Sequence, residues 1–91
     1  MLRILVVCGH GLGSSFMLSM TARKACEELG IEAEIGHTDF SSAKSERADL
    51  YIATQDIADQ LEDGTRTVIK VLNIMDRQFL KEAIRRHIEG G

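Results

Sequence analysis

The chain has few of the residues and runs that mark several common classes of protein. It has two cysteines, Cys8 and Cys26, too far apart for a C-x-x-C pair and too few for a four-thiolate zinc site. Its longest unbroken apolar stretch, residues 4–8, is about a quarter of the roughly 20 residues that a membrane-spanning helix needs. No signal-peptide pattern is present. We therefore expect a cytoplasmic protein with free thiols and with no metal or other cofactor.

The chain also lacks a block of positive charge. Lys and Arg number 11 against 14 Asp and Glu, which gives a net charge of −3, and no basic run could neutralise a row of phosphates. Nucleic acid is therefore not an expected partner. With 91 residues, 44% hydrophobic and 27% charged, the chain has the balance of a folded protein but cannot be divided into two cores. We predict one domain over residues 1–91, without repeats or linkers.

Strand-like and helix-like patterns alternate along the sequence. Four segments have the apolar pattern of strands, the second of them weakly alternating as in an edge strand: residues 3–7, 32–38, 49–53 and 67–72. Helical spacing follows at 14–29, which Gly30 ends, and at 56–61, and residues 41–47 suggest a turn or short helix. Asp76 can cap a last helix whose apolar face holds Leu80, Ala83, Ile84 and Ile88.

This alternation predicts an α/β fold of three αβα layers. Each helix returns the chain to the same edge of the sheet by a right-handed crossover, so the four-stranded sheet should be mainly parallel. We expect the strand order 2-1-3-4 of Rossmann or flavodoxin-like proteins, with a crevice beyond the carboxyl ends of the first and third strands. Cys8 falls at that crevice, and the loops that begin at Thr54 and Asn73 should form its walls.

The segment that joins the first strand to the first helix has the composition of an anion cradle. It reads C-G-H-G-L-G-S-S, and its three glycines allow backbone N–H groups to turn inward. The N-terminus of the following helix adds unpaired N–H groups and a partial positive charge, which should favour the thiolate form of Cys8. We predict Cys8 as the nucleophile and a phosphate site formed by Gly9, His10, Gly11, Leu12, Gly13, Ser14 and Ser15.

Other interpretations of this segment remain open. The glycines could simply form a tight turn beside a small buried cysteine. A Walker A loop would need a lysine, and a dinucleotide loop would need G-x-G-x-x-G, with only Asp39 available as a ribose ligand. Cysteine phosphatases and arsenate reductases of similar topology have an arginine six positions after the cysteine, where this chain has Ser14. A small enzyme of that kind is the alternative function, and a non-catalytic anion-binding regulator is a third.

The segment V-C-G-H-G-L-G-S-S, from Val7 to Ser15, resembles the phosphocysteine loop of enzyme IIB components of the phosphoenolpyruvate-dependent sugar phosphotransferase system, most closely the ascorbate type. The resemblance extends over the length and element order of the whole chain. It implies a protein-phosphocysteine sugar phosphotransferase in which Cys8 accepts phosphate from a phosphohistidine on a IIA protein. It further implies transfer to a sugar, with L-ascorbate as the candidate, through a membrane IIC partner with which the protein associates peripherally. This chain departs from that family at His10, where family members more often have asparagine.

Several other residues have a structural and a functional interpretation. His10 could contact phosphate or be a bystander, but it is not the expected nucleophile. Phe16, Met17 and Met20 could belong to the core, or they could form a docking patch for protein partners.

Five further residues are expected to be structural. We predict Cys26 to be a buried structural thiol. Asp56 and Asp76 are expected as helix N-caps, and His37 and His87 as surface or structural residues without a metal.

Overall fold

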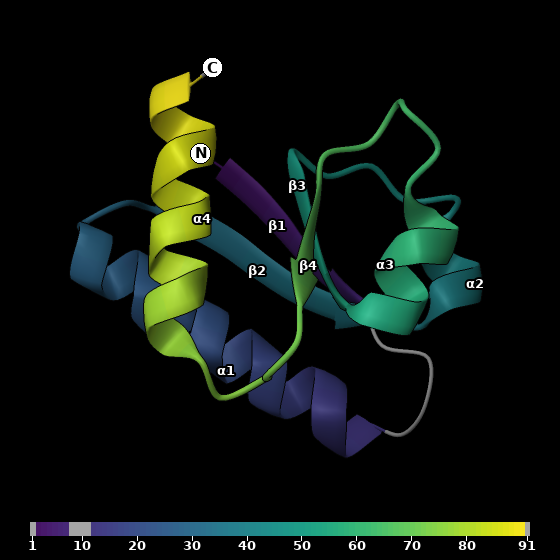
Figure 1. Ribbon diagram of the computed structural model, residues 1–91, viewed down its shortest axis with the longest axis horizontal. Helices are drawn as coiled ribbons and strands as arrows, with labels where there is room; N and C mark the ends of the chain where they lie inside the picture. The colour runs from purple at the N-terminus through teal and green to yellow at the C-terminus, as the bar shows by residue number, and fades with distance from the viewer. Residues whose placement is uncertain (1, 8–11, 91) are drawn as a thin grey trace.

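The computed structural model describes residues 2–7 and 12–90, with side chains described for residues 2–7 and 16–89. Within these residues, strands and helices alternate in the predicted order (Figure 1). The elements are β1 (Leu2–Val7), α1 (Leu12–Leu29), β2 (Ala33–Thr38), α2 (Phe40–Ala43), β3 (Leu50–Thr54), α3 (Gln55–Leu61), β4 (Val68–Val71) and α4 (Arg77–Gly90).

The strands form one parallel sheet in the order β2-β1-β3-β4. β1 pairs with β2 on one side and with β3 on the other, so that Val7 lies beside both Thr38 and Ala53. β4 completes the sheet by pairing Val71 with Thr54. The predicted α/β fold and strand order are confirmed, and every pairing among the described strands is parallel.

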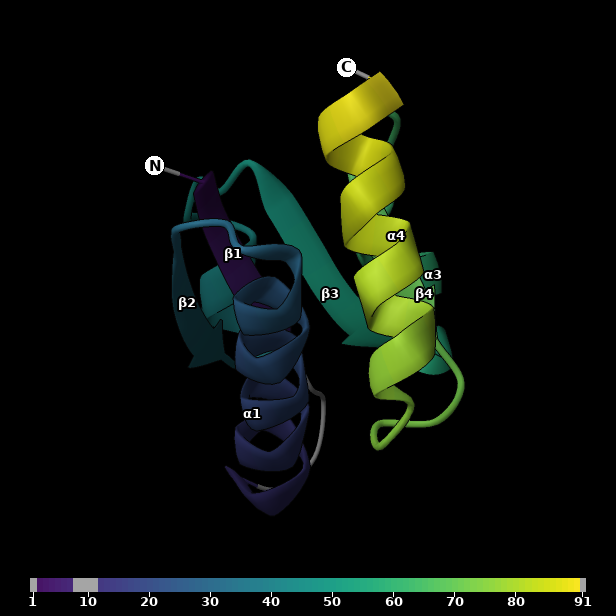
Figure 2. The ribbon, with the colours of Figure 1, turned by 90° about the vertical axis from the view of Figure 1, so that its left-hand side faces the viewer.

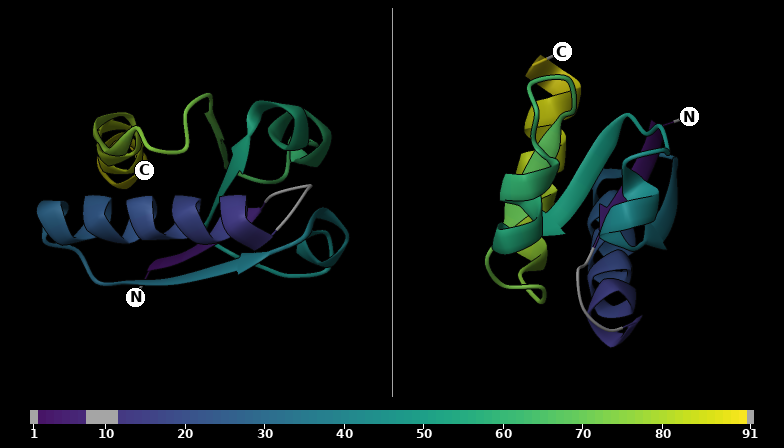
Figure 3. Two further views of the ribbon diagram at one scale, coloured as in Figure 1. Left: turned by 90° about the horizontal axis from the view of Figure 1, so that it is seen from below. Right: turned by 90° about the vertical axis from the view of Figure 1, so that its right-hand side faces the viewer.

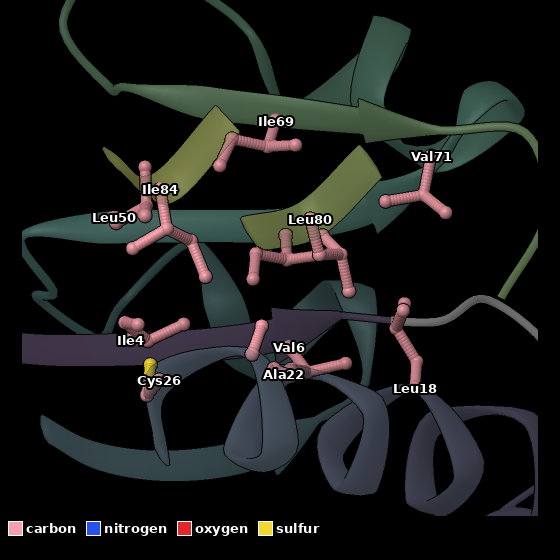
Figure 4. Close-up of a cluster of buried hydrophobic side chains, with 12 residues drawn as sticks. Ile4, Val6, Leu18, Ala22, Cys26, Leu50, Ile69, Val71, Leu80 and Ile84 are labelled. Carbon is pink, nitrogen blue, oxygen red and sulfur yellow. The ribbon is translucent and has the colours of Figure 1, made fainter. Parts of the chain in front are cut away.

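Helices cover both faces of the sheet. α1 and α4 pack side by side on one face (Figure 2), and α2 and α3 cover the other; Figure 3 gives the same layers from below and from the right-hand side. The larger core lies under α1 and α4 (Figure 4) and contains Ile4, Val6, Leu18, Ala22, Ala25, Cys26, Leu50, Ile52, Ile69, Val71, Leu80 and Ile84. Alternate residues of β1 and β3 point to the smaller core on the opposite face, as the two-residue period of a strand requires.

The first helix ends where its sequence predicts. Gly30 has φ of 71°, a left-handed conformation that glycine adopts without a Cβ clash. Its N–H donates to the carbonyl of Glu27 at 3.1 Å, and the N–H of Ile31 donates to the carbonyl of Cys26 at 3.2 Å. These two bonds form a Schellman motif, which satisfies the last carbonyl groups of α1 and turns the chain towards β2.

Two predictions about helix ends need correction. Ile88 was expected on the buried face of α4, but it is 45% exposed, while Leu80 and Ile84 are fully buried. At 1.5 Å per residue α4 is about 21 Å long against about 13 Å for β4, so its last turns extend past the strand beneath it. Asp56 was expected as an N-cap; the cap position of α3 is Thr54, and Asp56 lies in the first turn. Asp76 does cap α4, accepting a 3.0 Å hydrogen bond from the N–H of Phe79.

The beginning of β1 and the end of α4 lie at the same end of the molecule (Figures 1 and 2). The carboxyl ends of the strands and the start of α1 lie at the opposite end. This arrangement follows from the topology, because the strands are parallel and each helix runs back against them.

Candidate active site

The carboxyl edge of the sheet contains a topological switch point. From β1 the chain passes through α1 to β2 on one side, whereas β3 lies on the other side and leads through α3 to β4. The two crossovers therefore leave the centre of the sheet in opposite directions. Ligand sites of open α/β sheets lie at such a point, beyond the carboxyl ends of the two central strands. Here those ends are Val7 and Thr54.

The predicted phosphate loop starts at this point. Cys8, Gly9, His10 and Gly11 lie outside the described residues. The structure describes the chain on both sides of them: Val7 ends β1 and Leu12 begins α1. The first helix thus begins two residues before the predicted Ser14, and Leu12, Gly13, Ser14 and Ser15 form its first turn. The N–H groups of a first helical turn have no acceptor within the helix, and such groups commonly bind anions.

The two segments predicted to form the walls of the crevice, which begin at Thr54 and Asn73, differ in structure. No loop follows β3, because α3 begins at Gln55 directly after Thr54; the hydroxyl of Thr54 donates to Asp56 Oδ1 at 3.0 Å. After β4, residues 72–76 form a compact connection. Asn73 Oδ1 accepts from the N–H of Met75 at 2.9 Å, and the carbonyl of Asn73 accepts from the N–H of Asp76 at 3.0 Å. Asn73 therefore fixes the shape of this second wall.

The second cysteine is a structural residue, as predicted. Cys26 is 4% exposed and packs with Ile4 and Ala22 in the larger core (Figure 4). Burial raises the pKa of the Cys26 thiol, because the charged thiolate is poorly solvated there. A protonated, enclosed thiol is a poor nucleophile, so Cys26 is excluded as a phosphate acceptor.

The remaining polar candidates do not form a second site. His37 is exposed and His87 half-buried, and no group of three metal-ligating side chains occurs among the residues the structure describes. Asp39, considered as a ribose ligand, instead caps α2: it accepts a 2.7 Å hydrogen bond from the N–H of Ser42. That bond and the one from the Ser42 side chain lower the pKa of Asp39. None of the helices in the described part of the chain is long and apolar enough to cross a membrane.

Exposed apolar side chains gather near the start of α1. Phe16, Met17 and Met20 are 55%, 41% and 45% exposed, so they do not belong to the core. Met75, from the connection between β4 and α4, joins Met17 and Met20 in lining one groove. Sequence patterns did not single out Met75, because a residue in an irregular segment has no periodicity that indicates which surface it joins.

The family model of the phosphotransferase system (PTS) lactose/cellobiose-specific IIB subunit matches residues 3–86. The chain therefore belongs to the PTS IIB family, whose members are phosphotransferase components of sugar transport. This membership confirms the resemblance found in the sequence.

Two kinds of similar protein are found, sequence relatives named for ascorbate and a structural neighbour named for lactose. An ascorbate-specific PTS EIIB component of Mycoplasma pneumoniae is 27% identical over 86 residues, covering 91% of this chain and 90% of the relative. Its counterpart in Salmonella typhimurium is 33% identical over 76 residues, covering 80% and 75%. The lactose-specific IIB domain of Streptococcus pneumoniae has a similar fold, with a TM-score of 0.60 at 15% identity over 97% of this chain and 95% of that one.

Proposed function

We propose that this protein is a single-domain IIB phosphoryl carrier, residues 1–91, that holds phosphate covalently on Cys8. The main support is the place of the C-G-H-G-L-G-S-S segment in the chain. It follows the central strand β1 at the switch point of the sheet, and its last four residues begin the long helix α1. Membership of the PTS IIB family supports the same function.

The proposed reaction is two successive transfers of one phosphoryl group. The Cys8 thiolate attacks the phosphorus of a phosphohistidine on a IIA protein; the S–P bond forms, the N–P bond breaks, and the imidazole nitrogen keeps the electron pair. A sugar hydroxyl then attacks the same phosphorus, the S–P bond breaks, and the thiolate is regenerated while the hydroxyl proton passes to solvent. Backbone N–H groups of residues 9–15 and the N-terminal field of α1 stabilise the charge on the phosphoryl oxygens in both steps.

A carrier, unlike a phosphatase, must not pass phosphate to water. The absence of an arginine at Ser14, six positions after Cys8, supports transfer over hydrolysis. The arginine that follows β4, Arg77, is paired with Glu28 at 2.7 Å. This ion pair joins α4 to α1, and the Arg77 guanidinium is therefore already paired with a carboxylate.

The proposed sugar is L-ascorbate, taken up through a membrane IIC protein with which this cytoplasmic carrier associates peripherally. Relatives named ascorbate-specific are 27–33% identical to this chain over aligned stretches of 76–86 residues. The lactose-specific domain, at 15% identity, shows a similar fold only. The lactose/cellobiose description of the family model is the competing assignment.

The test is phosphorylation in a reconstituted system. The protein is incubated with phosphoenolpyruvate, the general phosphotransfer proteins and either an ascorbate-type or a lactose-type IIA protein, and intact-mass and peptide analysis locate the phosphate. We expect one phosphoryl group on Cys8, with the ascorbate-type donor preferred. Cys8→Ser should abolish this adduct, while the matched variant Cys26→Ala and the loop variant His10→Asn should retain it.

Three results would contradict the proposal. Phosphorylation of Cys8→Ser at the wild-type rate would remove Cys8 from the mechanism. Preference for the lactose-type donor would overturn the ascorbate assignment. Rapid hydrolysis of p-nitrophenyl phosphate, without acceptance of phosphate from either IIA protein, would favour the phosphatase alternative.

A further inference from the structure

Three of the four methionines of the chain meet in one exposed groove, which we call the methionine groove. It has a volume of about 280 Å³ and is lined by Met17, Met20, Thr21, Lys24, Met75 and Arg77. Met17, Met20 and Met75 are 41%, 45% and 61% exposed. Exposed apolar side chains that gather in this way mark an interaction surface more often than scattered ones do.

Met17 and Met20 give α1 exposed apolar side chains outside its buried face. One face of the helix, with Leu18, Ala22 and Ala25, is fully buried against the sheet. The groove residues of α1 follow the spacing i, i+3, i+4 and i+7 and form a separate stripe. No charged residue occurs in α1 before Arg23. A helix face that met only water would be polar, so this stripe suits a partner.

The groove is built before any partner arrives. Thr21, which is 9% exposed, donates its hydroxyl hydrogen bond to the carbonyl of Ile74 at 2.9 Å, and so ties the connection after β4 to α1. Glu28 of α1 accepts from Arg77 at 2.7 Å and from Lys81 at 3.4 Å, which ties the start of α4 to the same helix. Backbone segments fixed in this way have little conformational entropy left to lose on binding.

The charge of the groove indicates the chemistry of the partner. Its two charged lining residues, Lys24 and Arg77, are both cations. Arg77 is paired with Glu28, whereas Lys24 has no ion pair among the residues that the structure describes. Two copies of this surface would bring the cations of one copy close to the cations of the other, which disfavours a symmetric dimer. The cytoplasmic loops of membrane proteins are rich in Lys and Arg, which disfavours the transporter as the occupant.

We propose that the methionine groove docks the phosphate-donating IIA protein, through an apolar surface of that protein flanked by carboxylates. The inference rests on the proposed function. Met17 and Met20 lie about 8 Å and about 12 Å along α1 from Leu12, where the helix follows the phosphate loop. An interface of about 800 Å² per partner, centred on that loop, would reach them. Methionine side chains adapt to their partner, which suits an interface that forms and dissociates in every cycle.

The test compares polar replacements inside and outside the groove. The triple variant Met17→Gln, Met20→Gln, Met75→Gln keeps side-chain length and removes apolar character. Ile88→Gln on α4 is the matched control, because Ile88 and Met20 are both 45% exposed. The initial rate of protein phosphorylation is measured against the concentration of phosphorylated ascorbate-type IIA, with circular dichroism to verify folding.

We expect the triple variant to raise KM by at least about tenfold with kcat within about twofold, and the control to leave both unchanged. Lys24→Glu should also raise KM and should weaken its dependence on salt concentration. An unchanged KM in the triple variant would overturn the inference. So would a defect confined to sugar phosphorylation in the presence of the IIC protein, or concentration-dependent self-association of the wild type that the triple variant loses.

Failure of the proposed function gives a different pattern. If the wild type accepts no phosphate, binding of unphosphorylated ascorbate-type IIA is measured by calorimetry. Binding that the triple variant loses and Ile88→Gln retains would uphold the docking surface without phosphate transfer. No binding by the wild type, or equal binding by all variants, would overturn it.

Discussion

Replacing Thr21 by valine isolates one hydrogen bond between α1 and the connection after β4. The two side chains have almost the same shape, so packing is preserved while the hydroxyl is lost. In the native protein the Thr21 hydroxyl has one proton and two acceptors, the carbonyl of Ile74 at 2.9 Å and the carbonyl of Met17 at 3.1 Å. The carbonyl of Met17 also accepts the helical N–H of residue 21. The substitution therefore leaves Ile74 as the acceptor that loses its partner.

The expected cost follows from the surroundings of that carbonyl. A buried acceptor left without a partner costs about 1–3 kcal/mol. Ile74 is half-buried, so water can replace part of the bond, and we expect a loss of about 1 kcal/mol. For a domain of this size that loss corresponds to a fall in Tm of roughly 4–8 °C. The assay is thermal unfolding followed by circular dichroism.

Ser19 provides the control, as a second buried hydroxyl in the same helix. It donates at 2.7 Å to the carbonyl of Phe16, one turn earlier in α1, and forms no hydrogen bond to another element within the described part of the chain. That carbonyl keeps its helical partner, and alanine has the higher helix propensity, so Ser19→Ala should change the free energy of unfolding by less than about 0.5 kcal/mol. Equal effects of Thr21→Val and Ser19→Ala, or no effect of Thr21→Val, would refute the role of Thr21 in tying the two segments together.

Three further outcomes are expected. Leu80→Ala should lower the free energy of unfolding by about 2–5 kcal/mol in a urea titration, because Leu80 is fully buried, whereas Ile88→Ala should cost less than about 0.5 kcal/mol. Gly30→Ala should lower the free energy of unfolding by about 1 kcal/mol, because alanine is strained at φ of 71°. A Cβ at this position meets no atom within 4 Å, so no steric clash contributes, and a neutral result would contradict backbone strain as the cause. Hydrogen bonds from Ser42 lower the pKa of Asp39 in the folded state, so its stabilisation is present above the unfolded pKa of about 3.9 and is lost as pH falls through the lower folded value. Asp39→Asn, which retains a capping side chain, should therefore flatten the dependence of stability on pH below about pH 4, and an unchanged slope would argue against it.

Much of the fold could be predicted because local signals agree with it. The branched apolar run that became β1 is buried on both faces of the sheet, as such a run requires. Gly30 follows the last apolar position of α1 and adopts the left-handed conformation that ends a helix. β2, with its weaker alternation, is an edge strand. Asp76 precedes a helical pattern and caps it.

Other features depend on packing that no local signal encodes. Ile88 continues the apolar spacing of Leu80 and Ile84, but its burial depends on how far the sheet extends beneath α4. Met75 lines the same groove as Met17 only because the sheet topology brings the connection after β4 onto α1. At the proposed site, the residue types indicated the chemistry of Cys8, and its role remains a prediction for the phosphorylation assay.

The positions of the chain ends have a practical consequence. The beginning of β1 and the last turn of α4 lie at the end of the molecule away from the carboxyl edge of the sheet (Figure 1). An affinity tag, a fluorophore or a surface tether fused at either terminus would therefore point away from Thr54 and from the start of α1. Immobilised protein should keep this edge accessible, which makes tethered formats suitable for measuring partner capture.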